Sequence, residues 1–339
     1  VRGLQTEADT RHDAFARDPQ LAAVYSDEDT LDAKGRRSAP LFKPDFDGER
    51  LLAQNYVNHA FAVRTELLRR LGGVREGFDA AQDHDLVLRV AEAAPGAIGH
   101  IPAVLYHWRV YPGGQTLSQR QAGAAQARLA VVRDALKRRR VAAEVEVGPG
   151  GYATVERRLP EPRPSILAIV PTRDRPALLE ACVAGLVEQT DWPDLRVRIV
   201  DNGSETPGAR AALARLAAHP RVEVLRIEGP FNFSALNNAA ASGADAELLA
   251  FVNDDILVVE PDWLGRMAAL AAQPDVGAVG AKLHYPDGRL QHAGWGRGRG
   301  PQGRAGHEFR GQPGDTPGPQ RRLLIAREGS AVSAACVVV

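Results

Sequence analysis

Between residues 166 and 255 the sequence alternates short apolar runs with longer stretches whose apolar residues recur at helical spacing. The apolar runs lie at 166–170, 197–204, 222–227 and 248–255, and the helical stretches between them at 175–189, 209–219 and 234–243. Strands that alternate with helices in this order predict a parallel sheet. We therefore expect an α/β fold with a doubly wound, mainly parallel sheet.

Polar clusters follow three of these predicted strands. "PTRDR" follows the first, "DNGS" the second and "NDD" the fourth. In open α/β sheets ligands bind beyond the carboxyl ends of the strands, so these clusters should meet at one edge. Asp254 and Asp255 are adjacent there, and two buried carboxylates need a positive partner. A Mg²⁺ or Mn²⁺ ion, which takes oxygen ligands, is the predicted partner.

The region before residue 147 has a different pattern. The stretch 21–32 predicts a strand that ends in three carboxylates, and 78–94 predicts an acidic turn that feeds a helix starting near Leu86. The stretch 98–110 predicts a strand that ends in "HWR". A helix is expected over 118–140, and residues 147–163, rich in Gly, Pro and charge, predict a linker between two regions.

Composition narrows the class of protein. The 339 residues carry 42 basic and 42 acidic side chains, and this balance argues against a nucleic-acid partner. Two cysteines cannot build a disulfide framework, which favours a reducing, cytoplasmic location. The sequence has no apolar run long enough to span a bilayer, although "KRRR" at the end of the 118–140 helix leaves peripheral association with a membrane as a minority interpretation. The start at Val1 and the strand-like end "SAACVVV" suggest a fragment of a longer chain.

The motifs "SILAIVPTRDRPALLEACVAGLVEQT", "IVDNGS", "FNFSALNNAAASGADAELLAFVNDDI" and "VGAVGAKLHYPDGRLQHAG" resemble the first half of a family 2 glycosyltransferase of the GT-A fold. The motifs "YSDEDTLD", "FKPDF", "NYVNHAFAVRTELLRRLGGVREGFDAAQDHDLVLRV" and "HIPAVLYHWR" resemble the second half of another such domain. The resemblance implies two incomplete GT-A domains in tandem, 1–146 and 164–339. Bacterial enzymes that build O-antigen and other surface polysaccharides have this arrangement.

The resemblance also implies an activity. A hexosyl or deoxyhexosyl group would pass from a nucleotide-sugar donor to a glycan or lipid-linked acceptor, with inversion and with Mg²⁺ or Mn²⁺ assisting. A nucleotidyltransferase is an alternative, but it needs a glycine-rich loop where "PTRDRP" stands. A phosphatase with an aspartate nucleophile would need Thr at Leu31. A nucleotide-sugar-binding module without catalysis is a third alternative, because Asn253 replaces the first acid of the family's metal-binding motif.

The resemblance assigns roles to individual residues. An inverting transfer needs a base for the acceptor hydroxyl, and charge neutralisation at the leaving diphosphate. The base falls on Asp83 and the diphosphate contact on Arg109. The remaining roles are nucleotide binding by Pro171, Thr172, Arg173, Asp201, Asn238 and Asp254, and metal binding by Asp27, Asp29 and His107 in the first region and Asp255 in the second.

Each assignment has a purely structural alternative. His107 could cap a strand, Asp83 and Asp85 could cap a helix, and Asp201 could be only a turn residue. Four further positions are expected to have structural roles: His292 and His307 in a surface loop, and Phe231 and Phe233 in the core. The fragment 164–339 is expected to bind a nucleoside diphosphate without transferring sugar, since the predicted base lies outside it.

Overall fold

The computed structural model describes residues 2–110, 125–296 and 305–339. The chain divides into two compact units. Unit 1 comprises Val1–Glu156 and Pro317–Glu328, and unit 2 comprises Arg157–Thr316 and Gly329–Val339. The chain therefore leaves unit 2 once, contributes a short segment to unit 1, and returns to unit 2 for its last strand.

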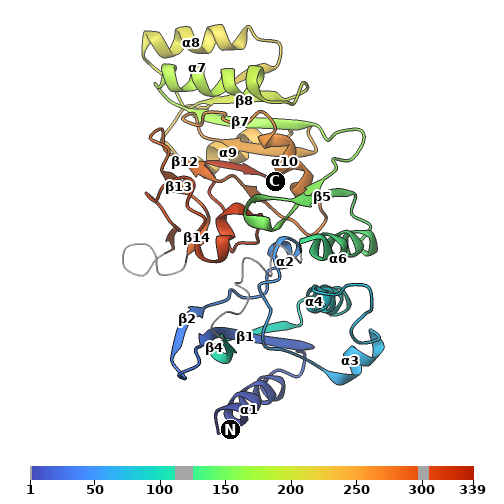
Figure 1. Ribbon diagram of the computed structural model, residues 1–339. Coiled ribbons are helices and arrows are strands. Elements are labelled where there is room, and N and C mark those ends of the chain that lie inside the picture. The colour runs from blue at the N-terminus through green and yellow to red at the C-terminus, as the bar shows by residue number, and fades with distance from the viewer. Residues whose placement is uncertain (1, 111–124, 297–304) are drawn as a thin grey trace. The chain divides into compact units, whose positions relative to one another are not determined.

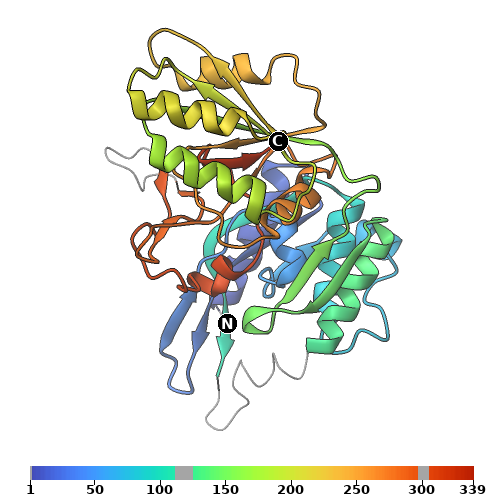
Figure 2. The same ribbon diagram turned by 90° about the horizontal axis from the view of Figure 1, so that it is seen from above.

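Unit 2 is built around a six-stranded sheet with the strand order β11-β16-β10-β7-β8-β9. The neighbours β10, β7, β8 and β9 are parallel, which confirms the predicted parallel-rich α/β sheet. β16 is antiparallel to β10, and the C-terminus marked in Figure 2 follows it. The strands are β7 (Ile166–Thr172), β8 (Arg196–Asp201), β9 (Val222–Arg226), β10 (Leu248–Val252), β11 (Val279–Gly280) and β16 (Cys336–Val338).

The helices of unit 2 follow the predicted alternation, and α7 and α8 lie side by side in Figure 1. Proline stands in the first turn of both, where its missing N–H costs nothing. The side chains of Thr206 and Asn232 cap α8 and α9 by accepting hydrogen bonds from backbone N–H groups. The helices are α7 (Pro176–Ala184), extended by the π-helical turn η2 (Gly185–Gln189), α8 (Pro207–Ala217), α9 (Phe233–Ala241) and α10 (Trp263–Ala271).

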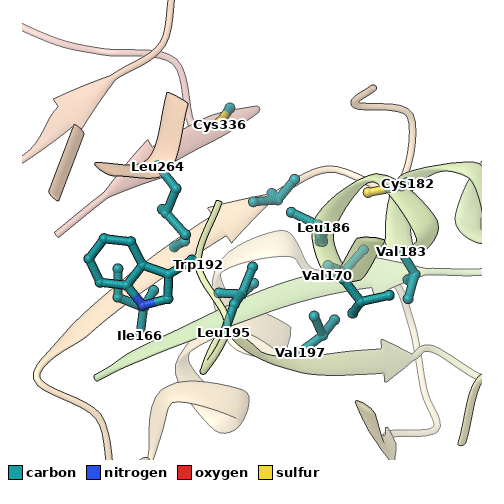
Figure 3. Close-up of a cluster of buried hydrophobic side chains, with 14 of the residues drawn as sticks. Ile166, Val170, Cys182, Val183, Leu186, Trp192, Leu195, Val197, Leu264 and Cys336 are labelled. Carbon is teal, nitrogen blue, oxygen red and sulfur yellow. The ribbon is translucent and has the colours of Figure 1, made fainter. Parts of the chain in front are cut away.

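Side chains of β7 alternate between two hydrophobic clusters. One cluster joins β7 to α7, α8 and α10 and also holds Trp192, shown in Figure 3. The other joins β7 to Leu236 and Ala240 of α9. Cys182 and Cys336 are buried in the first cluster as free thiols. Burial of each large apolar side chain stabilises the fold by roughly 1.5–3 kcal/mol, which fixes the sheet edge that carries the polar loops.

Four short strands form two antiparallel pairs beside the main sheet of unit 2. They are β12 (Leu283–His284) with β13 (Leu290–His292), and β14 (Trp295–Gly296) with β15 (Gly306–His307).

Unit 1 has a four-stranded sheet in which β1 (Ala23–Leu31) pairs with all three other strands. β2 (Arg37–Leu41) and β3 (Phe61–Val63) are antiparallel to β1, and β4 (Ile98–Arg109) is parallel to it. The other elements are α1 (Arg2–Arg17), α2 (Gly48–Ala53), α3 (Thr65–Arg70), α4 (Gln82–Ala93), α6 (Ala125–Arg138), β5 (Ala143–Val147), η1 (Pro149–Gly151), β6 (Ala153–Arg157) and η4 (Pro319–Leu324).

The carboxylates Asp27, Glu28 and Asp29 lie inside β1, although the sequence predicts them at a strand end. β4 pairs with β1 as far as Leu31, so the strand continues through the acidic run. The register shifts around Asp27 and Glu28, which marks an irregularity of the bulge type. The acidic run is therefore held on both sides by neighbouring strands.

Two further predictions for unit 1 differ from the structure. α4 begins at Gln82, one turn before the predicted start near Leu86. The predicted linker 147–163 contains η1 and β6, and β6 pairs with β5. Val145 and Ala153 of this pair are buried in the core of unit 1, because the alternating apolar residues of both strands give the hairpin a hydrophobic face.

The basic run at the end of α6 is largely used inside unit 1. Arg138 pairs with Glu92 and Asp134, and Arg139 also pairs with Glu92. The predicted helix over 118–140 is described from Ala125 onward, and its earlier residues lie outside the described part. Within the described ranges, no helix combines the length and apolar character needed to cross a membrane.

Candidate functional site

The polar residues that follow β7, β8 and β10 meet at the carboxyl edge of the sheet in unit 2. Thr172, which ends β7, is the register neighbour of Asp201, which ends β8. The Thr172 hydroxyl donates a hydrogen bond to Asp254, which follows β10, at 2.7 Å. The structure thus brings together three of the residues that the sequence assigns to nucleotide binding. Pro171 is buried in β7, directly before them.

The positive partner of the acidic pair in unit 2 is an arginine. Arg175 Nη1 lies 2.8 Å from Asp254 Oδ1, and Nη2 lies 3.5 Å from Asp255 Oδ2. Asp254 is 4% exposed, and burial raises the pKa of its carboxyl against the opposing effects of Thr172 and Arg175. The sequence analysis missed Arg175, although it is the second arginine of the "PTRDR" loop that gave Arg173.

Asp201 is buried at the end of β8, and both of its carboxylate oxygens have partners. Oδ1 accepts a hydrogen bond from Ser204 N at 2.8 Å, and Oδ2 accepts one from Arg226 at 2.7 Å. Gly203, which lies between Asp201 and Ser204 in the chain, has φ +73°, a conformation that favours glycine. The turn role of Asp201 is therefore present in the structure, and Arg226 is a neighbour that the sequence analysis did not single out.

The acidic residue of the "PTRDR" loop, Asp174, joins two loops of this edge. Asp174 Oδ1 accepts hydrogen bonds from Glu205 N and Thr206 N, both at 2.9 Å. Its own backbone N–H donates to Ser204 Oγ at 3.1 Å. The hydrogen bond from Thr206 N holds the pKa of Asp174 below its ordinary value. The loops after β7 and β8 are thus tied together at their tips.

Two predicted nucleotide contacts, Arg173 and Asn238, are exposed in the structure. The neighbouring Asn237 is the buried asparagine of α9, and its side chain donates to Phe233 O at 2.8 Å. Phe231 is 67% exposed, so its predicted place in the core is wrong. It lies in the loop before α9, outside the stripe of that helix that faces the sheet. Phe233, within α9, is half-buried.

In unit 1, the structure brings Asp29 and His107 together as neighbours in the β1–β4 register. His107 Nδ1 lies 2.5 Å from Asp29 Oδ1, and Arg37 Nε lies 2.6 Å from Asp29 Oδ2. Burial raises the pKa of Asp29, but the hydrogen bonds from His107 and Arg37 outweigh it and leave the pKa below its ordinary value. This carboxylate is therefore ionised and paired.

Asp27, the third predicted metal ligand of unit 1, has other partners. Its Oδ1 accepts a hydrogen bond from Lys43 N at 2.8 Å and lies 2.9 Å from His100 Nε2. No group of three His, Cys, Asp or Glu residues in the described part of the chain is placed to hold a metal ion. The structure thus assembles Asp29 with His107 but does not add Asp27 to them. His100, the third residue of the predicted strand 98–110, was not anticipated.

Glu28, between the two aspartates, is held by a buried lysine. Lys43 Nζ lies 3.1 Å from Glu28 Oε2 and donates to Val57 O at 2.7 Å and to His59 O at 2.5 Å. Burial lowers the pKa of Lys43, which the nearby Glu28 carboxylate opposes. The "FKPDF" motif therefore supplies the counter-charge of the acidic strand.

The two aspartates of "QDHDL" have different environments. Asp83 is exposed in the first turn of α4, where Asn55 Nδ2 donates to its Oδ2 at 3.0 Å. Asp85 is fully buried and pairs with Arg75 and with Arg89 Nε, the latter at 2.8 Å. The capping prediction is wrong for both, because the cap of α4 is Ala81, which makes no side-chain hydrogen bond.

Two further predictions concern residues near strand ends. Arg109 is exposed at the end of β4. His292 is 3% exposed, so its predicted place in a surface loop is wrong. Its Nδ1 lies 2.8 Å from Nδ1 of His307, and the His307 ring lies 4.4 Å from that of Trp295 between centroids. β13 pairs with β12, and β14 pairs with β15, and this pairing places the rings together.

Unit 2 has the properties of a ligand-binding domain of the doubly wound α/β class. Four parallel strands end at one edge, and Thr172, Asp201 and Asp254 gather there. That is where open α/β sheets bind their ligands.

Residues 167–320 match the sequence model of the glycosyl transferase family 2. This match confirms, for this part of the sequence, the resemblance to family 2 glycosyltransferases. The tandem arrangement stays a prediction.

Two curated relatives match nearly the whole chain. The O-antigen biosynthesis protein RfbC of Myxococcus xanthus is 43% identical over 333 residues, which are 96% of this chain and 25% of that protein. The uncharacterized protein y4gI of Sinorhizobium fredii is 39% identical over 325 residues, which are 95% of this chain and 36% of that protein. The chain thus spans between a quarter and about a third of the length of these relatives.

Among solved structures, the chain is similar to the mannosyltransferase PcManGT of Pyrobaculum calidifontis in complex with GDP-Man and Mn²⁺. The identity is 24%, the match covers 50% of this chain and 47% of that one, and the TM-score is 0.33.

Proposed function

We propose that this chain is part of a glycosyltransferase that moves a sugar from a nucleotide-sugar donor to a glycan or lipid-linked acceptor in surface polysaccharide synthesis. The observation that carries the proposal is the family 2 match over 167–320 together with the meeting of Thr172, Asp201 and Asp254 at one sheet edge. The similarity to an O-antigen biosynthesis protein supports the polysaccharide context.

The two units have different parts in this proposal. Unit 2 binds the nucleotide, with Asp201 toward the base or ribose and the loop of Thr172 and Asp254 toward the diphosphate. Unit 1 belongs to a preceding domain of the same type and carries its acceptor side. We assign residues 1–146 to the first of these two successive domains and residues 164–339 to the second. A complete domain of this type transfers the sugar with inversion at the anomeric carbon.

Asp83 is the proposed base of unit 1. Its carboxylate is exposed, so an acceptor hydroxyl can approach it, and Asn55 Nδ2 together with His84 N holds its orientation by hydrogen bonds of 3.0 and 2.9 Å. A positioned carboxylate accepts the hydroxyl proton as the oxygen attacks the anomeric carbon. Arg109, exposed at the end of β4, is the proposed cation for the leaving diphosphate.

Mg²⁺ or Mn²⁺ is the proposed metal cofactor. Asp29 and His107 fit such an ion in type, because a carboxylate and an imidazole in contact are both ligands that Mn²⁺ accepts. In unit 2 the half-exposed Asp255 would hold the ion. When bound, the ion neutralises charge that develops on the diphosphate. The protein's own contribution is to hold these side chains in place, Asp29 and His107 as neighbours in the β1–β4 pair and Asp255 in the loop after β10.

A screen of nucleotide sugars with the full-length protein in the presence of Mn²⁺ tests the proposal. Mass spectrometry should show a mass increase of the acceptor, or release of nucleoside diphosphate, for one donor. Asp201→Ala should weaken donor binding, whereas Asp262→Ala, which removes an exposed carboxylate paired with Arg266 in the same unit, should leave it unchanged.

The second candidate function is nucleotide-sugar binding without transfer, which Asn253 favours for unit 2 because it replaces an acid. Saturable donor binding without turnover of any donor would support that function. A protein that binds no nucleotide at all would contradict both.

A further inference from the structure

We propose that Arg175 is a diphosphate-binding residue of unit 2, which exchanges its contact with Asp255 for the phosphates when a nucleotide binds. The inference rests on the proposed nucleotide site and adds to it a residue that neither the sequence motifs nor the family match assigns. It also gives a role to the two adjacent carboxylates that follow the buried strand β10, because they hold Arg175.

The position of Arg175 suits this exchange. It stands in the loop after β7 and directly before α7, so the first backbone N–H groups of that helix lie next to it in the chain. The positive end of a helix and a guanidinium both attract anions. The Arg175 side chain is 46% exposed, and its contacts in the described structure are with Asp254 and Asp255. Most of its N–H donors thus stay available for a ligand.

The two carboxylates hold Arg175 with different strength. Asp254 is buried, and both of its oxygens have partners, Thr172 at 2.7 Å and Arg175 at 2.8 Å. Asp255 is half-exposed and lies 3.5 Å from the guanidinium, at the outer limit of a hydrogen bond. Asp254 therefore orients Arg175, and the loose contact with Asp255 is the one that a ligand can replace.

Charge explains why a ligand would replace it. A nucleoside diphosphate is strongly anionic, and Asp254 and Asp255 repel it unless a cation stands between them. A planar guanidinium binds two phosphate oxygens side by side, in the geometry that also suits a carboxylate. On the neighbouring strand end, the buried Asn202 has a side-chain oxygen without a hydrogen-bond partner, so this edge also contains an unsatisfied polar group.

The same geometry makes Arg175 a competitor of a metal ion in the absence of nucleotide. A divalent cation and a guanidinium cannot both approach Asp254 and Asp255 closely without repelling each other. Removal of Arg175 should therefore have opposite effects on two ligands. Mn²⁺ alone should bind more tightly, because a competitor is gone, and the nucleoside diphosphate should bind more weakly, because a phosphate partner is gone.

Calorimetry on the full chain tests this pair of effects. Mn²⁺ is titrated alone, and GDP and UDP are titrated with and without Mn²⁺, into the wild type, Arg175→Ala, Arg175→Lys and the control Arg215→Ala. Arg215 is an exposed arginine of the same unit that pairs with Glu180 on α7. Thermal unfolding of each variant confirms that it is folded.

For Arg175→Ala we expect a loss of about ten- to a hundredfold in diphosphate affinity, the range of a charge-assisted hydrogen bond. The affinity for Mn²⁺ alone should rise severalfold. Arg175→Lys, which keeps the charge but not the planar fork, should fall between the wild type and Arg175→Ala, and Arg215→Ala should match the wild type.

Three results would overturn the inference. Unchanged diphosphate affinity in Arg175→Ala, while the wild type binds the nucleotide, contradicts the inference and leaves the proposed function standing. A parallel loss of both affinities assigns Arg175 a purely structural role. A wild-type chain that binds neither GDP nor UDP contradicts the proposed function and the inference together.

Discussion

Asp83 and Asp85 both lie in the first turn of α4. Replacing each in turn by asparagine should separate an effect on sugar transfer from an effect on folding stability. Asp85 is fully buried between Arg75 and Arg89, and hydrogen bonds from these arginines hold the pKa of its carboxyl below its ordinary value despite burial. Arg89 is itself buried and donates to the backbone oxygens of Leu71 and Gly73 at 2.8 and 2.7 Å. It cannot move out to solvent without breaking those bonds.

Asp85→Asn therefore leaves the charge of Arg89 buried without its anion. Breaking a buried ion pair in this way costs about 3–5 kcal/mol of folding free energy. For a unit of this size, about 1 kcal/mol lowers the melting temperature by roughly 2–4 °C, so a decrease of roughly 6–20 °C is expected. Asp83→Asn removes an exposed charge and keeps the hydrogen bond from Asn55 within reach, so its stability should stay within about 0.5 kcal/mol of the wild type.

Thermal unfolding followed by circular dichroism measures the first effect, and sugar transfer by the full-length protein measures the second. Asp83→Asn should lower turnover by roughly 10²–10⁴, the scale of one general base, with donor affinity little changed. An Asp85→Asn variant as stable as the wild type would refute the ion-pair argument. A fully active Asp83→Asn variant, or one that also loses donor binding, would refute the assignment of the base.

Three further expectations follow from the same contacts. Burial lowers the pKa of His84 from 6.5 to about 4, so on acidification the unfolded chain takes up a proton at this histidine before the folded chain does. Lowering the pH from 6.5 to about 4 should therefore destabilise unit 1 by about 3 kcal/mol. Asp47, with a pKa raised to about 6, acts in the opposite direction, so the effect of His84 is measured as the difference between wild type and His84→Gln across that pH range. Asp29→Ala should abolish metal-dependent transfer by the first domain, measured with the full-length protein and a Mn²⁺ titration, and transfer at the wild-type rate would contradict the ligand assignment. Thr172→Val removes a hydrogen bond to the buried Asp254 and should cost about 1–3 kcal/mol in a denaturant titration.

The strands and helices between residues 166 and 255 could be predicted because each has a local pattern of its own. Strands such as β7 are short, continuously apolar runs, and α7 and α8 carry helical periodicity with proline in the first turn. The order of these elements then limits the sheet to parallel neighbours. The segment Pro317–Glu328, which joins unit 1, has no such local signal, because its place depends on contacts with residues far away in the sequence.

The partners of the candidate site residues could not be predicted for a related reason. The carboxylates of "NDD" and "SDED" are visible in the sequence, but their partners are distant in it, as Arg175 is from Asp254. The phase of a helix is a second limit. Asn237 and Asn238 are adjacent in α9, and only the packing of the helix on the sheet shows that Asn237 is the buried one.

The two acidic clusters of the chain are neutralised in different ways, and the difference bears on how each would take a metal ion. In β1, each carboxylate has partners of its own. Asp27 contacts His100, Glu28 contacts Lys43, and Asp29 contacts both His107 and Arg37. In unit 2, Asp254 and Asp255 share a single guanidinium, and one of them holds it at 3.5 Å.

An ion that binds at Asp29 must displace the guanidinium of Arg37 and requires His107 as a neutral imidazole, so its affinity should fall on acidification. An ion that binds at Asp255 competes with one loosely held guanidinium and needs no histidine. Both acidic clusters require positive charge, but the number of cations that the chain itself supplies decides how much of that requirement is left for a ligand.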